Sequence, residues 1–286
     1  IVLNGYLLLN LGISFYIVYN HYRGQDPKAS RYFPWVLLAI FWAISIHTVT
    51  AFLYSANTGR PFWHNALLAP RFIASAFCSG PALAIIILQL VRRLAHYPVR
   101  QSAIDTLGVT MTVALQITLF FVIAELFTDF YSEGTHSASA RYLFFGLHGA
   151  SMLTPWIWTA LAMLVVAVTI LMVYPLRRNP ALFTLACVLT VIGVWIEKGM
   201  GLVIPGYIPT PLGEVFEYLP NWTEVSISLG IWAIGLLTFT LLAKAGMAIE
   251  RGQVRLRDDI EEELAGLTED EEDGDMESLA HQQPVK

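Results

Sequence analysis

The sequence contains little charge. Asp, Glu, Lys and Arg make up only 14% of the 286 residues, whereas 56% are hydrophobic, and the mean hydropathy is +0.57. This balance excludes an ordinary soluble domain and is typical of a membrane protein.

Motifs of several common functional classes are also missing. The chain has no Gly-rich phosphate loop, no nucleic-acid-binding motif and no Cys/His set with metal-ligand spacing. Its two cysteines, Cys78 and Cys187, lie far apart in apolar runs. They exclude a disulfide framework and an iron–sulfur site within this chain.

Apolar runs of helix length are abundant. A transmembrane helix needs roughly 20 apolar residues, whereas transmembrane β-strands are alternating segments of about ten. Runs such as PALAIIILQLV are apolar on every face, which favours helices. We therefore predict an all-α integral membrane protein, a helical bundle with spans at 1–19, 32–54, 71–91, 107–127, 142–173, 181–204 and 222–243.

The first run begins at Ile1 without a methionine. It has no basic leading region and no small-residue cleavage site, so it does not fit a signal peptide. We expect the natural N-terminus to lie upstream of this residue.

Basic residues gather at alternate helix ends and predict the orientation. Twelve of the 17 Lys and Arg residues fall on one side, which the positive-inside rule makes cytoplasmic. The C-terminus lies on that side too. The twelve basic residues on this side are Arg23, Lys28, Arg31, Arg92, Arg93, Arg100, Arg177, Arg178, Lys244, Arg251, Arg255 and Arg257.

The composition changes near the C-terminus, where RDDIEEELAGLTEDEEDGDMES carries 12 of the 22 acidic residues. We predict a transmembrane domain over 1–245 and an acidic, disordered cytoplasmic tail over 246–286. Docking of the tail to a basic partner remains the alternative.

Ionisable residues inside the spans collect in the outer halves once the orientation is fixed. Intramembrane charges are costly, so they persist where they face protein or water. We therefore predict a shared polar cavity on the outer side. Its candidate residues are His47, Arg71, Glu125, His148, Glu197, Lys198 and Glu224.

Glu197 and Lys198 stand side by side in VWIEKGMGLVIPGYIPTP. Adjacent helical residues point about 100° apart, so we expect each to have its own partner on another helix. Gly193 and Gly201 flank Glu197 by one turn, a spacing that allows close approach of a helix or a flat ligand.

Prolines mark breaks near this cavity. Pro81 and Pro155 are each predicted to free one helical carbonyl, a defect tolerated where protein or a water-filled cavity satisfies it. The segment after the sixth span, which contains Pro205, Pro209, Pro211 and Pro220, is predicted to form a stiff cap on the outer surface.

Structural roles stay open for most of these residues. His47 and His148 each fit a hydrogen bond to a neighbouring helix, a proton-handling group or a haem ligand. Arg71 and Glu224 lie at helix starts, where snorkelling to the interface is an equal explanation. Solvation near the surface would explain Glu125, and a structural role is least expected for Glu197.

Four stretches resemble a known family. IVLNGYLLLNLGISFYIVYN, SIHTVTAFLYSANTGRPFWHNALLAPRFIASAF, GLHGASMLTPWIWTA and WIEKGMGLVIPGYIPTPLGEVFEYLPNWTEVSISLGIWAIG are similar to the NrfD/polysulfide-reductase membrane-subunit family. The resemblance covers about residues 1–245. It implies that about three N-terminal spans of roughly 20 residues each are lacking from this chain.

The resemblance also implies a function. Such a subunit holds no metal or cofactor of its own and exchanges electrons with membrane quinone, either menaquinone or ubiquinone. Its expected partners are a periplasmic iron–sulfur subunit and other membrane and cytoplasmic subunits of a respiratory complex in sulfur or sulfite metabolism. Its expected location is the cytoplasmic (inner) membrane of a prokaryote.

Quinol oxidation releases two protons with two electrons, so the headgroup needs partners that accept protons. We assign Glu197 and His47 as headgroup partner or first proton acceptor, and His148 and Glu125 as exit steps.

The remaining assignments concern charge and docking. Arg71 or Lys198 is expected to supply a counter-charge at the quinone site. Glu214 or Glu217, beside the proline-rich cap, is expected to belong to the docking surface for the iron–sulfur subunit.

Two other functional classes remain open. A cytochrome b would use His47 and His148 as axial haem ligands from different spans. An ion or solute transporter would use the same charges and broken helices. The absence of an evident inverted repeat and the one-sided placement of the polar groups argue against the transporter.

Overall fold

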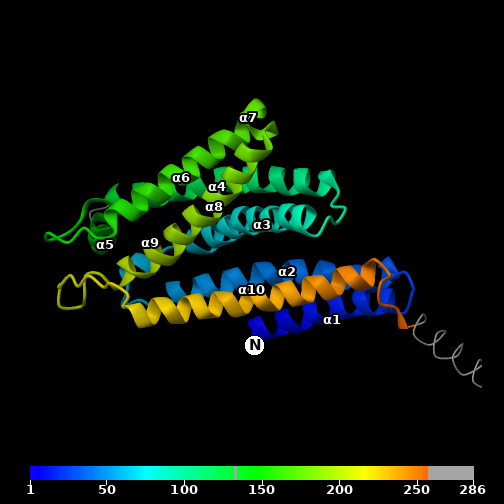
Figure 1. Ribbon diagram of the computed structural model, residues 1–286. Helices are drawn as coiled ribbons and strands as arrows, with labels where there is room; N and C mark the ends of the chain where they lie inside the picture. The colour runs from blue at the N-terminus through cyan, green and yellow to red at the C-terminus, as the bar shows by residue number, and fades with distance from the viewer. Residues whose placement is uncertain (132–133, 257–286) are drawn as a thin grey trace, which may run out of the picture. The chain divides into compact units, whose positions relative to one another are not determined.

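The computed structural model describes residues 1–131 and 134–256, and within these ranges the chain forms helices and no strand (Figure 1). Seven helical segments there are long and apolar enough to cross a membrane, which confirms the predicted all-α membrane fold. They are α1 (Val2–Tyr22), α2 (Ala29–Ser55), α3 (Leu68–Leu94), α4 (Gln101–Tyr131), α6 (Thr154–Met172), the segment Pro180–Tyr207 that begins with α8 (Pro180–Trp195), and α10 (Trp222–Glu250).

The predicted span over 142–173 is wrong in its bounds. The structure divides this region into α5 (Thr135–Phe145) and α6, separated by a turn. Gly146, with φ +86°, ends α5 in a backbone conformation that side chains rarely adopt. Pro155 lies in the first turn of α6, where its missing N–H removes no helical bond, so it does not break a span.

The described chain forms two compact units. One comprises Ile1–Trp42 together with the residues from Pro220 onward, and the other comprises Ala43–Leu219. α2 runs through the boundary between them. Most of the predicted acidic tail, from residue 257, lies outside the described residues, so its predicted disorder stays a prediction.

The first unit contains α1, the start of α2, and α10. Gly5 lets α1 approach α2 closely, because a methyl group at this position would collide with the indole of Trp42. The Trp42 Nε1 donates to the Val2 carbonyl at 2.9 Å, which links α2 to the start of α1. α10 begins with a capping box in which Asn221 accepts from the Glu224 backbone and Glu224 accepts in return.

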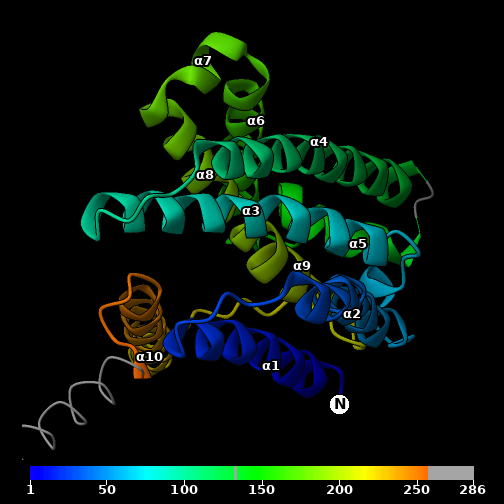
Figure 2. The ribbon, with the colours of Figure 1, turned by 90° about the vertical axis from the view of Figure 1, so that its right-hand side faces the viewer.

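The second unit is a bundle of α3, α4, α6 and α8. α3 and α4 run side by side in both views (Figures 1 and 2), and α8 packs against α3 and α6. Its apolar core includes fully buried Met111, Leu115, Leu164, Leu171 and Cys187. At one end of the unit a second apolar cluster surrounds Trp63, Leu68 and Tyr142.

The sixth span is not a regular helix. Asn179 caps α8 by accepting from the Ala181 and Leu182 backbones at 3.0 and 3.4 Å. After Trp195 the helix widens into a π-helical turn, η2 (Ile196–Met200), and then narrows again through α9 (Gly201–Val203) and the 3₁₀ turn η3 (Pro205–Tyr207). Such π-turns occur frequently at functional sites, and this one contains Glu197 and Lys198.

The glycines beside this turn serve helix packing. A methyl group at Gly193 would lie 2.8 Å from Leu164 Cδ2, and one at Gly201 would lie 3.1 Å from Ile157 Cδ1. Both neighbours belong to α6, so the two glycines let the sixth span approach α6 closely. Of the two predicted roles of this spacing, approach of a helix or of a flat ligand, the structure shows the first.

The end of the sixth span is anchored by Trp63 of the short 3₁₀ turn η1 (Pro61–Trp63). The Trp63 Nε1 donates to the Leu202 carbonyl at 2.9 Å, and its ring lies edge-on to Tyr54 and Tyr207, each with a centroid separation of 5.0 Å. A methyl group at Gly206 would overlap this indole.

Gly206→Ala is therefore expected to lower the free energy of unfolding by about 1–3 kcal/mol, the usual cost of overpacking a tight contact, and so to lower the melting temperature. Differential scanning fluorimetry in detergent would measure the change. Gly199→Ala is the matched control, because a methyl group there meets nothing within 4 Å. Equal stability of the two variants would show that Trp63 does not pack on Gly206.

Candidate functional site

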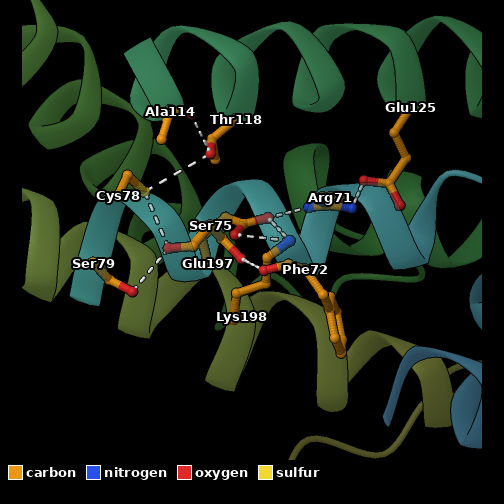
Figure 3. Close-up of polar contacts among 10 residues, drawn as sticks. All are labelled: Arg71, Phe72, Ser75, Cys78, Ser79, Ala114, Thr118, Glu125, Glu197 and Lys198. Carbon is orange, nitrogen blue, oxygen red and sulfur yellow. Dashed lines mark hydrogen bonds and ion pairs between the residues drawn. The ribbon is translucent and has the colours of Figure 1, made fainter. Parts of the chain in front are cut away.

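Arg71 is the centre of a buried charge cluster in the second unit. It lies in the first turn of α3, is only 7% exposed, and forms ion pairs with Glu197 of η2 and Glu125 of α4. Figure 3 shows its guanidinium between the two carboxylates. Snorkelling of Arg71 and solvation of Glu125, both left open by the sequence, are thereby excluded as explanations, since both side chains are buried.

Lys198 joins the cluster from the same π-turn as Glu197. Its Nζ lies 3.3 Å from Glu197 Oε2 and 5.3 Å from the centre of the Phe72 ring on α3. The expectation of separate partners on other helices is confirmed for Glu197, which meets Arg71. For Lys198 the expectation holds only for the aromatic contact, because its ion-pair partner is the neighbouring Glu197.

Asp129 is a fifth ionisable residue of this region that sequence analysis missed. It is 6% exposed, lies one turn beyond Glu125 on α4, and lines the same cavity as Arg71 and Glu197. The predicted span ended at residue 127, which placed Asp129 in a loop. The i,i+4 spacing of Glu125 and Asp129 was the available signal, since it places both carboxylates on one helix face.

The cavity between these side chains is small, about 10 Å³. That is the size of a single water molecule, far below the space that a quinone ring needs. Arg71 Nε donates no hydrogen bond to any described residue. A water in this cavity could therefore accept a hydrogen bond from it. The cavity therefore has room for a water but not for a ligand headgroup, which could reach the cluster only at its edge.

The edge of the cluster is at Lys198. Its side chain is 16% exposed, compared with 8% for Arg71, 10% for Glu125 and 1% for Glu197. The ammonium carries three donors on a flexible stem. A ligand oxygen would therefore meet Lys198 before any other cation of the cluster.

A line of small polar groups continues along α3 from Arg71 toward the C-terminal end of the helix (Figure 3). Ser75 donates to the Phe72 carbonyl at 2.9 Å, and Ser79 donates to the Ser75 carbonyl at 2.8 Å. Cys78 lies 3.7 Å from Thr118 Oγ1 on α4. Pro81 lies inside α3 just beyond them, as predicted, so the helix is locally weakened beside the cluster.

Neither of the predicted histidines lines the cavity of this cluster. His47 is half-buried in α2, within the second unit. His148 is exposed in the turn between α5 and α6, with φ +51°, so its predicted place inside a span is wrong. The haem alternative assumed two histidines inside spans, and that premise fails for His148. Glu224 caps α10 and belongs to the first unit.

The two candidate docking glutamates differ in their contacts. Glu217 is exposed, but its Oε1 accepts from the Met152 backbone at 2.7 Å and from the Tyr142 hydroxyl at 3.4 Å. Burial, together with the charge of Glu217, raises the pKa of Tyr142 to about 12, so the hydroxyl remains a donor. Glu214 is exposed, and its backbone closes a turn with Thr210. Glu217 thus connects the proline-rich segment to α5 and to the turn before α6.

These features define a multi-pass helical membrane protein with a charge cluster buried at one end of its four-helix unit. Residues 6–210 match the family model described as "Polysulphide reductase, NrfD". The chain belongs to this family.

Curated relatives carry names from quinone and oxidoreductase biochemistry. The Hdr-like menaquinol oxidoreductase integral membrane subunit of Archaeoglobus fulgidus is 26% identical over 77% of this chain and 58% of its own length. The menaquinone reductase integral membrane subunit of Nitratidesulfovibrio vulgaris is 28% identical over 66% of this chain and 47% of its own length. A putative dimethyl sulfoxide reductase membrane subunit of Halobacterium salinarum is 26% identical over 75% and 53%, respectively. The chain spans about half the length of these relatives.

Proposed function

We propose that this chain is a quinone-interacting membrane subunit of a multi-subunit oxidoreductase, which exchanges electrons between the quinone pool and an iron–sulfur partner. The observation that carries the proposal is the buried Arg71–Glu197–Glu125 network, placed inside apolar spans where charge is costly. Membership in the NrfD family and the names of the menaquinol and menaquinone relatives support it.

Lys198 and Glu197 are the pair that would serve the headgroup. The ammonium, at the accessible edge, donates a hydrogen bond to a quinone oxygen, while Glu197 lies directly behind it and accepts a proton. A headgroup binds beside Lys198, because the cavity between Arg71 and Asp129 takes no more than a water. His47 remains a candidate second partner of the headgroup.

Oxidation of a quinol releases two electrons and two protons. The electrons pass to the iron–sulfur cluster of the partner subunit, and the protons need acceptors on this chain. Glu197 is the first acceptor in this scheme, and the carboxylates of Glu125 and Asp129 continue toward the end of α4. Arg71 stays charged and keeps the carboxylates close together despite their mutual repulsion.

The finer identity rests on the motifs quoted above, which most resemble DsrP, the integral subunit of the DsrMKJOP complex of sulfur metabolism. In this scheme the chain lies in a prokaryotic cytoplasmic membrane, with its charge cluster in the outer half and its C-terminus in the cytoplasm. A periplasmic DsrO-like iron–sulfur subunit would dock near the proline-rich segment. Glu214 is the better docking candidate, because Glu217 is already engaged within the chain.

The test is titration of a fluorescent quinol-site inhibitor into the intact complex. Lys198→Met and Glu197→Gln are each expected to weaken binding at least about tenfold, since a hydrogen bond to a charged group contributes about 1.5–3 kcal/mol. Glu250→Gln, which changes an exposed carboxylate at the end of α10 outside the cluster, is the control and should bind normally. Normal binding by all three variants, with each complex intact by size-exclusion chromatography, would place the quinone elsewhere.

A further inference from the structure

We propose that a second site, at the other end of α3 from the charge cluster, binds the headgroup of an anionic phospholipid. A cavity of about 510 Å³ lies there, within the common size range of ligand pockets. We refer to it as the basic cavity, because Arg92, Arg177 and Arg178 line it. The proposal is independent of the quinone chemistry.

The ends of three spans, α3, α4 and α8, line the basic cavity together with the connection between α6 and α8. α3 ends at Leu94, α4 begins at Gln101, α6 ends at Met172 and α8 begins at Pro180. The short helix α7 (Tyr174–Arg178) closes the gap between α6 and α8. Because apolar spans begin and end where the hydrocarbon core does, the cavity lies at the depth of the lipid headgroups.

The charge of the cavity is predominantly positive. Asp105 is the one acidic residue among its lining side chains, and it accepts from Gln101 Nε2 at 3.1 Å. Arg92 Nη1 donates to Gln101 Oε1 at 3.0 Å, which orients it along the same wall. Among the described residues, none of the three arginines forms an ion pair with a carboxylate, so their charge is available to a phosphate.

Tyr174 sets the geometry of the other two arginines. The guanidinium carbons of Arg177 and Arg178 lie 5.9 and 5.0 Å from the centre of its ring. Stacking on an aromatic ring holds a guanidinium in place and leaves the N–H donors on its edge free. Two of these N–H groups can donate together to two oxygens of a phosphate. Arginines from α3 and α7, which are distant in the sequence, therefore line one cavity.

The inner wall of the cavity is apolar, which favours a lipid over a free phosphate. Ile104, Val109 and Phe183 line it together with Gly108. A methyl group at Gly108 would lie 3.0 Å from Phe183 Cζ, so the glycine lets α4 approach α8 closely. A headgroup phosphate at the arginines would leave the glycerol and first acyl carbons against this wall. Basic pockets between spans are known binding sites for anionic headgroups.

The sequence predicts that these arginines face the cytoplasm, where the leaflet is rich in anionic lipid. A lipid held here would join the α3–α4 end to the α6–α8 end of the unit. It would stabilise the packing of the bundle at the end remote from the Arg71 cluster.

Native mass spectrometry of the intact complex, titrated with cardiolipin or with phosphatidylcholine, tests the proposal. Wild type is expected to retain cardiolipin preferentially. The Arg92→Gln/Arg177→Gln/Arg178→Gln variant should bind it about a hundredfold more weakly, at roughly fivefold for each arginine near an anionic headgroup. Arg93→Gln, on the same last turn of α3 but outside the lining, is the matched control and should bind like wild type.

Two further experiments distinguish a lipid phosphate from free phosphate and separate loss of charge from misfolding. Inorganic phosphate is expected to compete only weakly, and the Arg177→Lys/Arg178→Lys variant should recover part of the binding because it keeps the charge. Equal retention of cardiolipin by the triple variant and by Arg93→Gln would overturn the proposal. So would equal retention of phosphatidylcholine and cardiolipin by wild type, or full displacement of the lipid by inorganic phosphate.

Discussion

Replacement of Arg71 by methionine is expected to prevent stable assembly of this protein. The substitution leaves Glu125 and Glu197 buried without the cation that they share. Removing one partner of a buried ion pair costs about 3–5 kcal/mol, because the remaining charge stays unpaired in an apolar environment. The yield and the thermal unfolding midpoint of a fluorescent fusion in detergent would measure the loss.

The controls separate charge balance from loss of a long side chain. Arg93→Met, at the exposed other end of α3, should behave like wild type. The variant Arg71→Met/Glu125→Gln removes the cation and one carboxylate together and leaves Glu197 paired with Lys198, so it should recover most of the stability. An Arg71→Met protein as stable as Arg93→Met would show that the two carboxylates have no need of this arginine.

The span count was predictable because it depends only on local composition. Apolar runs of sufficient length fix the number of helices irrespective of how the helices pack. The exact bounds were not, as the region around His148 shows. LFFGLHGASMLTP is apolar enough to continue a span, but Gly146 at positive φ ends α5, and Pro155 begins a new helix.

The candidate site was predictable in part. Glu197 was correctly expected to have a partner on another helix, since a deep carboxylate needs one. Arg71 was undervalued because a position at a helix start predicts solvent access. In the structure Phe62 and Phe144 line the cavity around it and exclude solvent. That cover comes from segments distant in the sequence, and no local pattern reports it.

The same limit applies to the basic cavity. Arg92 of α3 and Arg177 of α7 are separated by two spans, and the sequence analysis used both only to predict the orientation. Their convergence depends on the packing of α3 and α4 against α8. The sequence thus predicts a membrane side for each residue, whereas grouping the residues into a site requires the packing.

Glu197→Gln is expected to reduce quinol oxidation by about 10²–10⁴-fold while leaving the fold largely intact. The amide preserves the shape of the side chain but cannot accept a proton, and positioned proton acceptors contribute about that factor. Arg71 keeps Glu125 as an ion-pair partner in this variant, and Lys198, which loses Glu197, is the most exposed member of the cluster, so its charge is the least costly to leave unpaired. Reduction of the iron–sulfur partner by quinol, followed in single turnover, measures the effect.

Glu125→Gln is the matched comparison, because it also removes one carboxylate from Arg71 and alters the charge balance equally. If Glu197 is the first acceptor, Glu125→Gln should slow oxidation less. Residual turnover of Glu197→Gln should rise with pH, since solvent must then take the proton, and Glu197→Asp should restore part of the rate. Equal rates for the two glutamine variants, without that pH dependence, would reduce Glu197 to a structural partner of Arg71. The proton acceptor would then be sought at Asp129 or His47.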